Sequence, residues 1–129
     1  MTARKLNKIQ YAMLFETLIG PEDVGNTIEI DVPPNFVLLA ASVSVREAFD
    51  GTTPTVGIVD NKTAPTTIIA ATTDLTAVAD TEATAAKFTA YPSGGTIIVA
   101  PIGVGVTEGS AAVVVEGYVE GRQNERYGT

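Results

Sequence analysis

Residues 27–49, with the sequence TIEIDVPPNFVLLAASVSVREAF, contain the two strand patterns that decide the fold. In residues 27–32 apolar and acidic side chains alternate, which is typical of a strand with one buried and one wet face. Pro33-Pro34-Asn35 ends this strand, because proline removes a backbone donor. Residues 36–49 begin as a continuous apolar run and then alternate, which predicts a long strand that leaves the core.

Further short apolar runs follow, separated by turn residues at regular intervals. The segment at residues 9–19 is ambiguous, since its apolar spacing fits a strand or a short amphipathic helix. Residues 72–86 combine helix-favouring Ala with helix-disfavouring Thr, so we expect a long loop with at most one helical turn. The remaining predicted strands lie at residues 55–59, 66–71, 87–91, 96–101 (with a possible extension to 106) and 110–120.

This pattern gives about eight strands and no long helix, which predicts an all-β fold, an antiparallel β-sandwich or barrel. Eight strands fit a jelly roll in particular. An immunoglobulin-like sandwich is the alternative, but its Cys and Trp signature is absent because the chain contains neither residue. Within the 129 residues we expect an N-terminal arm, or a first strand and loop, at 1–25, a β-sandwich domain at 26–120 and a polar C-terminal tail at 121–129.

The composition disfavours an enzyme. The chain has no His and no Cys, so the usual proton shuttle, the thiolate nucleophile and the strongest transition-metal ligands are missing. The carboxylate pairs Glu29/Asp31 and Asp80/Glu82 could bind Ca²⁺ or form a glycosidase pair, but such sites normally gather ligands from several segments. We therefore expect no catalytic residues, no cofactor and no metal.

The Gly-rich residues 103–109 have a superficial likeness to a phosphate-binding loop. They lack the Lys-Ser/Thr of that motif and lie between two predicted strands, not before a helix. The pattern instead predicts a hairpin connection between the last two strands.

The charge distribution limits the choice of partner. A net charge of -7 disfavours nucleic acid, whose phosphates require a Lys/Arg surface. No apolar run is long enough to span a bilayer, and residues 9–20 are too polar for a signal peptide, so we expect a soluble protein made in the cytoplasm.

The basic residues concentrate at the two ends of the chain, whereas the middle is acidic. The termini of one copy could therefore meet the acidic body of another, or they could simply be solvated. The candidate partner contacts are the basic and tyrosine side chains of the two ends: Arg4, Lys5, Lys8, Tyr11, Arg122, Arg126 and Tyr127.

Four stretches of the chain carry a resemblance to a known group of proteins. They are F-x-G-T-x-P-T-V-G-I at residues 49–58, TTIIAATTDL at 66–75, YPSGGTIIVAPIGVG at 91–105 and GSAAVVVEGY at 109–118. Together they resemble small virion proteins of tailed bacteriophages. The resemblance extends over residues 26–120 and rests on turn and strand motifs; it does not include residues 1–25, so it says nothing of how such a protein would attach.

The resemblance implies a jelly roll or related β-sandwich that assembles on the virion. Many such proteins are head decoration (cement) proteins, which clamp neighbouring subunits of the major capsid protein, commonly as homotrimers. It therefore implies a location on the capsid surface, after synthesis in the cytoplasm of the bacterial host. Other members are head-fibre, neck or tail components.

Two alternatives remain open at this stage. A glycan- or receptor-binding module is one, since jelly rolls also serve as lectins, although the sequence offers few aromatic residues for a binding platform. The other concerns residues 5–18, which could add a strand to the exposed sheet edge of a partner. The same residues could equally form the first strand of the domain's own core.

Overall fold

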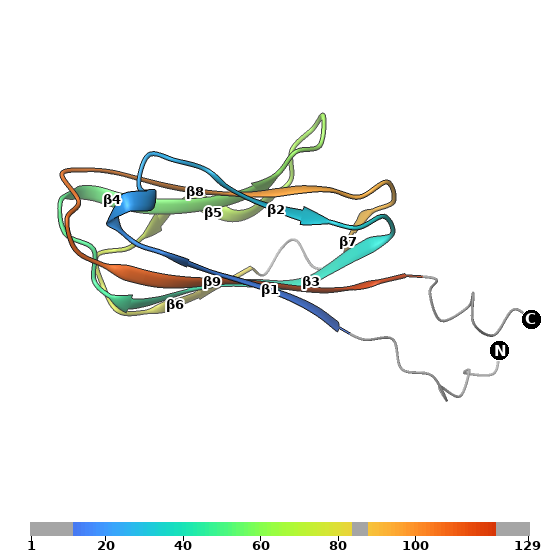
Figure 1. Ribbon diagram of the computed structural model, residues 1–129, viewed down its shortest axis with the longest axis horizontal. Helices are drawn as coiled ribbons and strands as arrows, with labels where there is room; N and C mark the ends of the chain where they lie inside the picture. The colour runs from blue at the N-terminus through green and yellow to red at the C-terminus, as the bar shows by residue number, and fades with distance from the viewer. Residues whose placement is uncertain (1–11, 84–87, 121–129) are drawn as a thin grey trace, which may run out of the picture.

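The computed structural model describes residues 12–83 and 88–120, which form nine strands in two antiparallel sheets packed face to face (Figure 1). Sheet A contains, in spatial order, β1 (Ala12–Ile19), β9 (Ser110–Val119), β3 (Phe36–Glu47) and β6 (Asp80–Glu82), and β7 (Thr89–Tyr91) also pairs with β3. Sheet B contains β2 (Ile28–Val32), β8 (Gly95–Val104), β4 (Thr52–Asp60) and β5 (Thr67–Asp74). A short 3-10 helix, η1 (Pro21–Asp23), lies between β1 and β2.

The strand pairing is that of a jelly roll. β7 pairs with residues 36–38 of β3 and β6 pairs with residues 42–44, so the two short strands together occupy the place of one. With β6 and β7 counted as one, the pairs β1–β9, β2–β8, β3–β6/β7 and β4–β5 are those of a long hairpin rolled into two sheets. The all-β antiparallel sandwich predicted from the sequence is confirmed.

Most predicted strands are present. The long strand from residue 36 runs to Glu47, and the strand from residue 96 continues past Pro101 to Val104. The ambiguous segment at 9–19 is a strand from Ala12 onward, as far as the structure describes it. Of the strand predicted at 87–91, residues 89–91 form β7, and residue 87 lies outside the described part of the chain.

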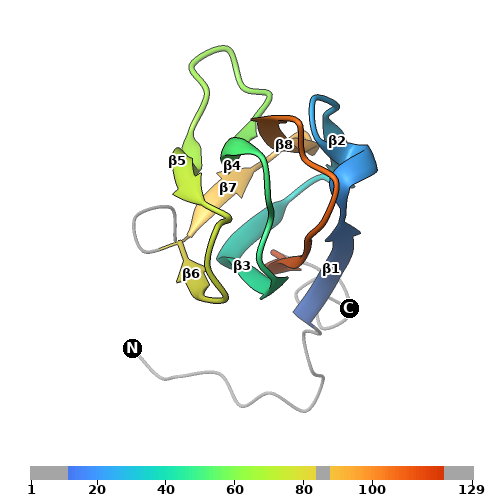
Figure 2. The same cartoon turned by 90° about the vertical axis from the view of Figure 1, so that its left-hand side faces the viewer.

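Two sequence predictions were wrong. Residues 72–86 are not one long loop, because β5 reaches Asp74 and β6 occupies residues 80–82. The three residues of β6 are all polar and held by backbone pairing to β3, which a hydrophobic pattern does not reveal. Residues 103–109 are also not a hairpin, since β8 and β9 belong to different sheets. Figure 2 shows this link and the β3–β4 link crossing between the sheets; turn residues indicate a chain reversal but not which strands pair.

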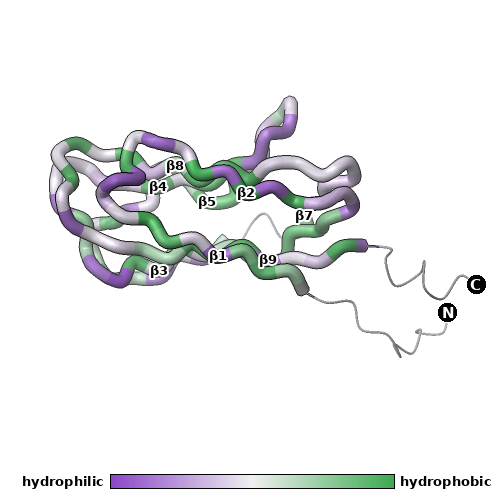
Figure 3. The backbone as a smooth tube through the Cα atoms, in the orientation of Figure 1, coloured by the Kyte–Doolittle hydropathy of each residue, from purple (hydrophilic) through white to green (hydrophobic). Residues whose placement is uncertain are grey.

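The core lies between the two sheets and is built from alternate side chains of each strand. Val56 and Ile58 of β4 and Ile97 and Val99 of β8 are 0% exposed on the sheet B side. They pack with fully buried side chains of sheet A, among them Val113, Val115 and Phe36. Hydrophilic stretches gather in the connecting loops, as Figure 3 shows. Among the described residues, no helix combines the length and apolar character that crossing a membrane requires.

Three aromatic rings cluster at one end of this core. The Phe36 ring meets Phe15 edge-on at 6.0 Å between centroids and lies 6.2 Å from the Tyr91 ring. Gly117 of β9 lies directly over this cluster, and a Cβ atom there would overlap the Phe36 ring and the Val37 carbonyl oxygen. Only glycine therefore allows β9 to pass this close to Phe36.

Candidate interaction surface

The contact residues predicted from the sequence lie outside the part of the chain that the structure describes. This holds for all seven: Arg4, Lys5, Lys8, Tyr11, Arg122, Arg126 and Tyr127. Their roles as partner contacts stay predictions. The candidate surfaces that can be described belong to the sandwich itself.

The outer face of sheet A is the most extensive of these surfaces. On β1, Leu14 and Leu18 are 61% and 65% exposed and flank the exposed Glu16. The β1–β9 register places these three side chains opposite Glu116, Ala112 and Val114 respectively. The β9–β3 and β3–β6 registers continue the same rows across the sheet, to Ala40, Ser42, Ser44, Glu82 and Asp80. The surface is thus a flat grid of small and aliphatic side chains with four carboxylates.

No basic side chain among the described residues lies in these rows. Arg46 and Lys62 are the only basic residues within 12–83 and 88–120: Lys62 lies in the β4–β5 loop, and Arg46 follows Ser44 at the end of β3, at a register shift, as one positive charge against four carboxylates. The field over the outer face of sheet A is therefore negative, and a partner with basic side chains would be attracted to it.

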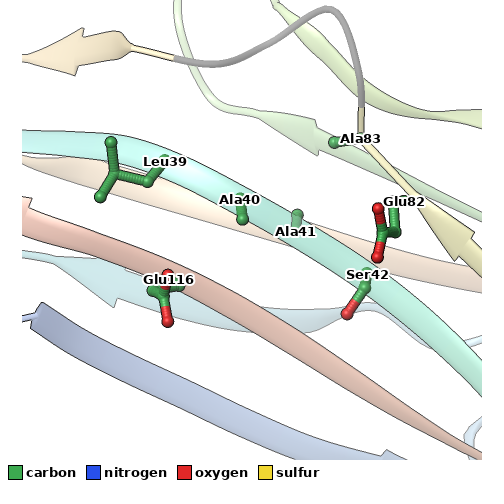
Figure 4. A pocket seen from close by; sticks show the side chains of 7 residues that line it. All are labelled: Leu39, Ala40, Ala41, Ser42, Glu82, Ala83 and Glu116. Carbon is green, nitrogen blue, oxygen red and sulfur yellow. The ribbon is translucent and has the colours of Figure 1, made fainter.

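A shallow hollow of about 230 Å³ lies on this face, where β6 ends and β7 has not yet begun. Leu39 and Ala40, which line it, lie at a register shift in the β3–β9 pairing. Figure 4 shows Glu116 on one side of Ala40 and Glu82 with Ser42 toward the other. The hollow is lined by Leu39, Ala40, Ala41, Ser42, Glu82, Ala83 and Glu116. This set offers apolar contact, one hydroxyl group and negative charge.

Other exposed apolar side chains are scattered over the loops and strand ends. Phe88 is 69% exposed and has a φ angle of 63°, and its N–H donates to the Leu38 carbonyl at 2.6 Å. Val78, Ile102 and Val104 are between 53% and 70% exposed. Ile102 and Val104 lie two residues apart at the end of β8 and share one face of sheet B, whereas Val78 and Phe88 lie in loops. The outer face of sheet A has the longer continuous rows and is therefore the better candidate surface.

The carboxylate pairs weighed from the sequence do not assemble into a site. Glu29 and Asp31 are both exposed on β2, on one face as the strand period requires, and Asp31 accepts a hydrogen bond from the Thr96 hydroxyl at 3.0 Å. Asp80 and Glu82 stand two residues apart on β6. Within residues 12–83 and 88–120, no group of three or more acidic side chains is arranged to hold a metal ion.

One carboxylate is buried, and its contacts are structural. Asp60, at the end of β4, is 1% exposed and accepts hydrogen bonds from the Thr66 N–H at 2.8 Å, the Tyr91 hydroxyl at 3.0 Å and the Lys62 N–H at 3.3 Å. Burial opposes ionisation of Asp60, but these donors outweigh it and hold its pKa below 3.8. Burial and the Asp60 charge raise the pKa of Tyr91. The pair therefore ties the β4–β5 loop to β7.

A second carboxylate, Asp50, anchors the link between β8 and β9. It accepts bonds from the Thr107 hydroxyl at 2.6 Å, the Thr107 N–H at 2.7 Å and the Glu108 N–H at 2.9 Å. These bonds, that of the Thr107 hydroxyl above all, lower the pKa of Asp50 to about 2. Neither Asp50 nor Asp60 has a neighbouring group that would make it an acid or a base catalyst, so both carboxylates fix loops.

Several solved structures have a fold similar to that of this chain. No protein-family model matches the chain, and no curated protein matches it. Among solved structures, a chain of the cyanophage Pam1 capsid asymmetric unit superposes with a TM-score of 0.68 at 14% identity, covering 92% of both chains. A chain of the acidic stable capsid of Helicobacter pylori bacteriophage KHP30 gives 0.60 at 12% identity, covering 85% of this chain and 90% of the other.

A third similar structure is the capsid of Ralstonia phage GP4. One of its chains gives a TM-score of 0.57 at 22% identity, covering 94% of this chain and 91% of the other. At such identities the likeness shows a shared fold. The likeness covers 85–94% of this chain and 90–92% of the other chains.

The sequence contained a signal for the surface that the structure reveals. Leu14, Glu16 and Leu18 alternate with Phe15 and Thr17, as on a strand with an apolar outer row. The same segment fits helical spacing, and this ambiguity hid the row.

Proposed function

We propose that this chain is a structural virion protein of a bacteriophage, and specifically a capsid decoration (cement) protein. In this proposal it binds the outer surface of the phage head and bridges subunits of the major capsid protein. The observation that carries it is the whole-chain likeness to chains from three phage capsids. The resemblance of residues 26–120 to small phage virion proteins, which rests on turn and strand motifs, also supports it.

The physical properties of the sandwich suit a bridging role. A decoration protein acts by adding buried interface between neighbouring shell subunits, and it needs a rigid body more than a reactive group. A stable interface buries about 800 Å² per partner, which a flat sheet face supplies better than a narrow cleft. The outer face of sheet A, with exposed Leu14 and Leu18 among carboxylates, is the surface that we propose for such contacts. The acidic grid requires a basic surface on the partner.

The copy number of the protein in purified particles tests the proposal. Quantitative mass spectrometry against the major capsid protein is expected to give a ratio comparable to unity, since decoration proteins cover the lattice. A trace ratio would contradict decoration and favour a head-fibre, neck or tail component. Absence from the particles would refute the virion role altogether.

A second experiment addresses the mechanism. Particles made without this protein are expected to release DNA at a lower temperature, and adding the purified protein should restore the wild-type value. The double variant Leu14→Ser/Leu18→Ser should restore less, because it removes the aliphatic contacts of the face. Glu29→Ser, an exposed change on β2, is the matched control and should restore fully.

A further inference from the structure

The four sheet edges of this protein are protected to very different degrees. β2 is five residues long, exposes Glu29 and Asp31, and is followed by Pro33-Pro34. The pairing of β5 with β4 contains two register shifts. β6 and β7 are three residues each and interrupted. Short strands, edge charges, prolines and bulges are the devices by which proteins prevent strands from adding to their sheets.

The β1 edge has almost none of these devices. It is eight residues long, pairs with β9 in continuous register, and contains no Pro, no Lys and no bulge. Among the described residues, no strand pairs with its other side. Its outer row consists of Leu14, Glu16 and Leu18, and the half-buried Phe15 and Thr17 lie on the other face. An edge of this kind is a template for a further strand.

We propose that the N-terminal segment of a second copy of this chain adds to the β1 edge as an antiparallel strand. Residues 1–11 carry three basic and no acidic side chains, whereas the face beside β1 is acidic. When extended, these residues span about 36 Å, which exceeds the length of β1, about 26 Å. The segment is thus long enough to cover the edge and complementary to it in charge.

The side-chain pattern of the segment fixes one register. Lys8 opposite Glu16 forms an opposite-charge pair in the outer row, and Leu6 then lies beside Leu18. In the same register Ile9 lies beside Phe15, toward the core. Three pairs in this register match in polarity, as strand addition with alternate side-chain contacts requires, whereas Gln10 falls beside Leu14 and Lys5 beside the buried Ile19.

The chain's own N-terminal segment cannot make this contact. Bringing residue 10 beside Leu14 would require a turn within residues 11–13, but Ala12 and Met13 are already paired with Tyr118 and Gly117 of β9. Pairing of β1 with β1 of a second copy brings no opposite charge to Glu16, and in the register centred on Glu16 it sets two like charges opposite each other. The N-terminal segment of another molecule supplies that opposite charge and is the occupant that we propose.

The resulting contact is head-to-tail, so each copy gives a strand and receives one. Such contacts close into a ring when the rotation allows it. The inference does not rest on the capsid role, and its test uses the purified full-length protein without particles. Failure of one proposal would therefore not be mistaken for failure of the other.

Cysteine cross-linking tests the pairing directly, because the wild-type chain contains no Cys. Lys8→Cys and ¹⁵N-labelled Glu16→Cys are mixed under mild oxidation. Opposed residues of an antiparallel pair have Cα atoms about 4.5–5.5 Å apart, within the range for a disulfide. We expect mass spectrometry to show a mixed-isotope disulfide dimer as the main product. In the control, ¹⁵N-labelled Glu29→Cys replaces Glu16→Cys, and the yield of the mixed-isotope disulfide dimer should be at least about tenfold lower. Equal yields would overturn the proposal.

Charge exchange supplies the second test, with oligomeric state followed by native mass spectrometry and light scattering over a dilution series. Lys8→Glu and Glu16→Lys should each raise the concentration for half-assembly by about fivefold, and the double variant should return to within about twofold of wild type. Lys62→Glu, a charge reversal in the β4–β5 loop of sheet B, is the control for Lys8→Glu and should leave the half-assembly concentration unchanged. The proposal would be overturned if the wild-type protein stayed monomeric over the whole dilution series, or if the single variants assembled like wild type. A monomeric wild type would leave the β1 edge to a strand from another protein.

Discussion

Asp60 offers the sharpest test of how the sandwich is held together. Its carboxylate is 1% exposed and accepts three hydrogen bonds, two from loop N–H groups and one from the Tyr91 hydroxyl. Asp60→Ala removes all three acceptor contacts. The N–H groups of Lys62 and Thr66 can turn to water, since both residues are partly exposed. The Tyr91 side chain, itself 1% exposed, keeps a buried hydroxyl without this acceptor.

The size of the effect follows from these contacts. An unsatisfied buried hydroxyl costs about 1–3 kcal/mol, and loss of the two bonds from N–H groups to a charge adds about 1 kcal/mol after rehydration. We expect Asp60→Ala to lower the free energy of unfolding by about 3 kcal/mol, and Tyr91→Phe by about 1–2 kcal/mol. Because the two residues share one bond, the double variant should cost about 1 kcal/mol less than the sum.

Urea unfolding at pH 7 gives these values, and repetition at lower pH tests their electrostatic part. The folded-state pKa of Asp60 lies below 3.8, so the unfolded state binds the proton first as the pH falls. The stabilisation is fully present above pH 3.8 and is lost as the pH falls through the folded-state value. The deficit of Asp60→Ala should therefore shrink in acid.

Asp31→Ala is the matched control, because Asp31 is an exposed carboxylate with a hydrogen bond from one hydroxyl. It should change the free energy of unfolding by less than about 0.5 kcal/mol. The reasoning would be refuted if Asp60→Ala lowered the free energy of unfolding no more than Asp31→Ala does, or if its effect were the same at pH 7 and at pH 3.

Three further outcomes follow from the packing and the loops. Gly117→Ala should lower the free energy of unfolding by about 3 kcal/mol, measured by urea midpoint, because its Cβ overlaps the Phe36 ring; a near-neutral result would show that β9 can move away. Asp50→Ala should speed hydrogen exchange at the Thr107 amide at pH 7, because the acceptor of that amide is lost. In the wild-type protein the exchange rate, corrected for intrinsic pH effects, should approach the rate of the variant only as the pH falls from 3.8 toward about 2, where Asp50 becomes protonated. Ile97→Val should cost about 1 kcal/mol in thermal or urea unfolding, since the side chain is 0% exposed; no loss would contradict a close-packed core.

The sequence predicted those strands in which burial alternates along the chain. In β3 the pattern of a continuous run followed by alternation matches the observed burial, which is continuous over residues 36–38 and alternates over residues 41–45. β6 could not be predicted in the same way. Its side chains are polar, and only the pairing of residues 42–44 with residues 80–82 makes it a strand. Long-range backbone pairing leaves no periodic trace in a three-residue segment.

The connection after β8 shows a related limit. Glycines at 103, 105 and 109 indicate a reversal of the chain, and Gly105 and Gly109 do have positive φ angles of 69° and 134°. The same residues would suit a hairpin. Whether the chain forms a hairpin depends on the partner of β9. In a hairpin β9 would pair with β8, but here it pairs with β1 and β3 of the other sheet. Turn chemistry is local, whereas this choice is made by the whole sandwich.

The candidate surface illustrates the same distinction between local pattern and tertiary context. Leu14 and Leu18 could have been core residues of a helix, and the sequence alone does not exclude that. They become candidates for binding only because β1 is the last strand of sheet A and its register with β9 turns them outward. Their exposure beside an unprotected edge, set against three protected edges, is what makes a partner strand the simplest explanation. If β1 were covered by a strand of the same molecule, the two leucines would be ordinary surface residues and that explanation would be unnecessary.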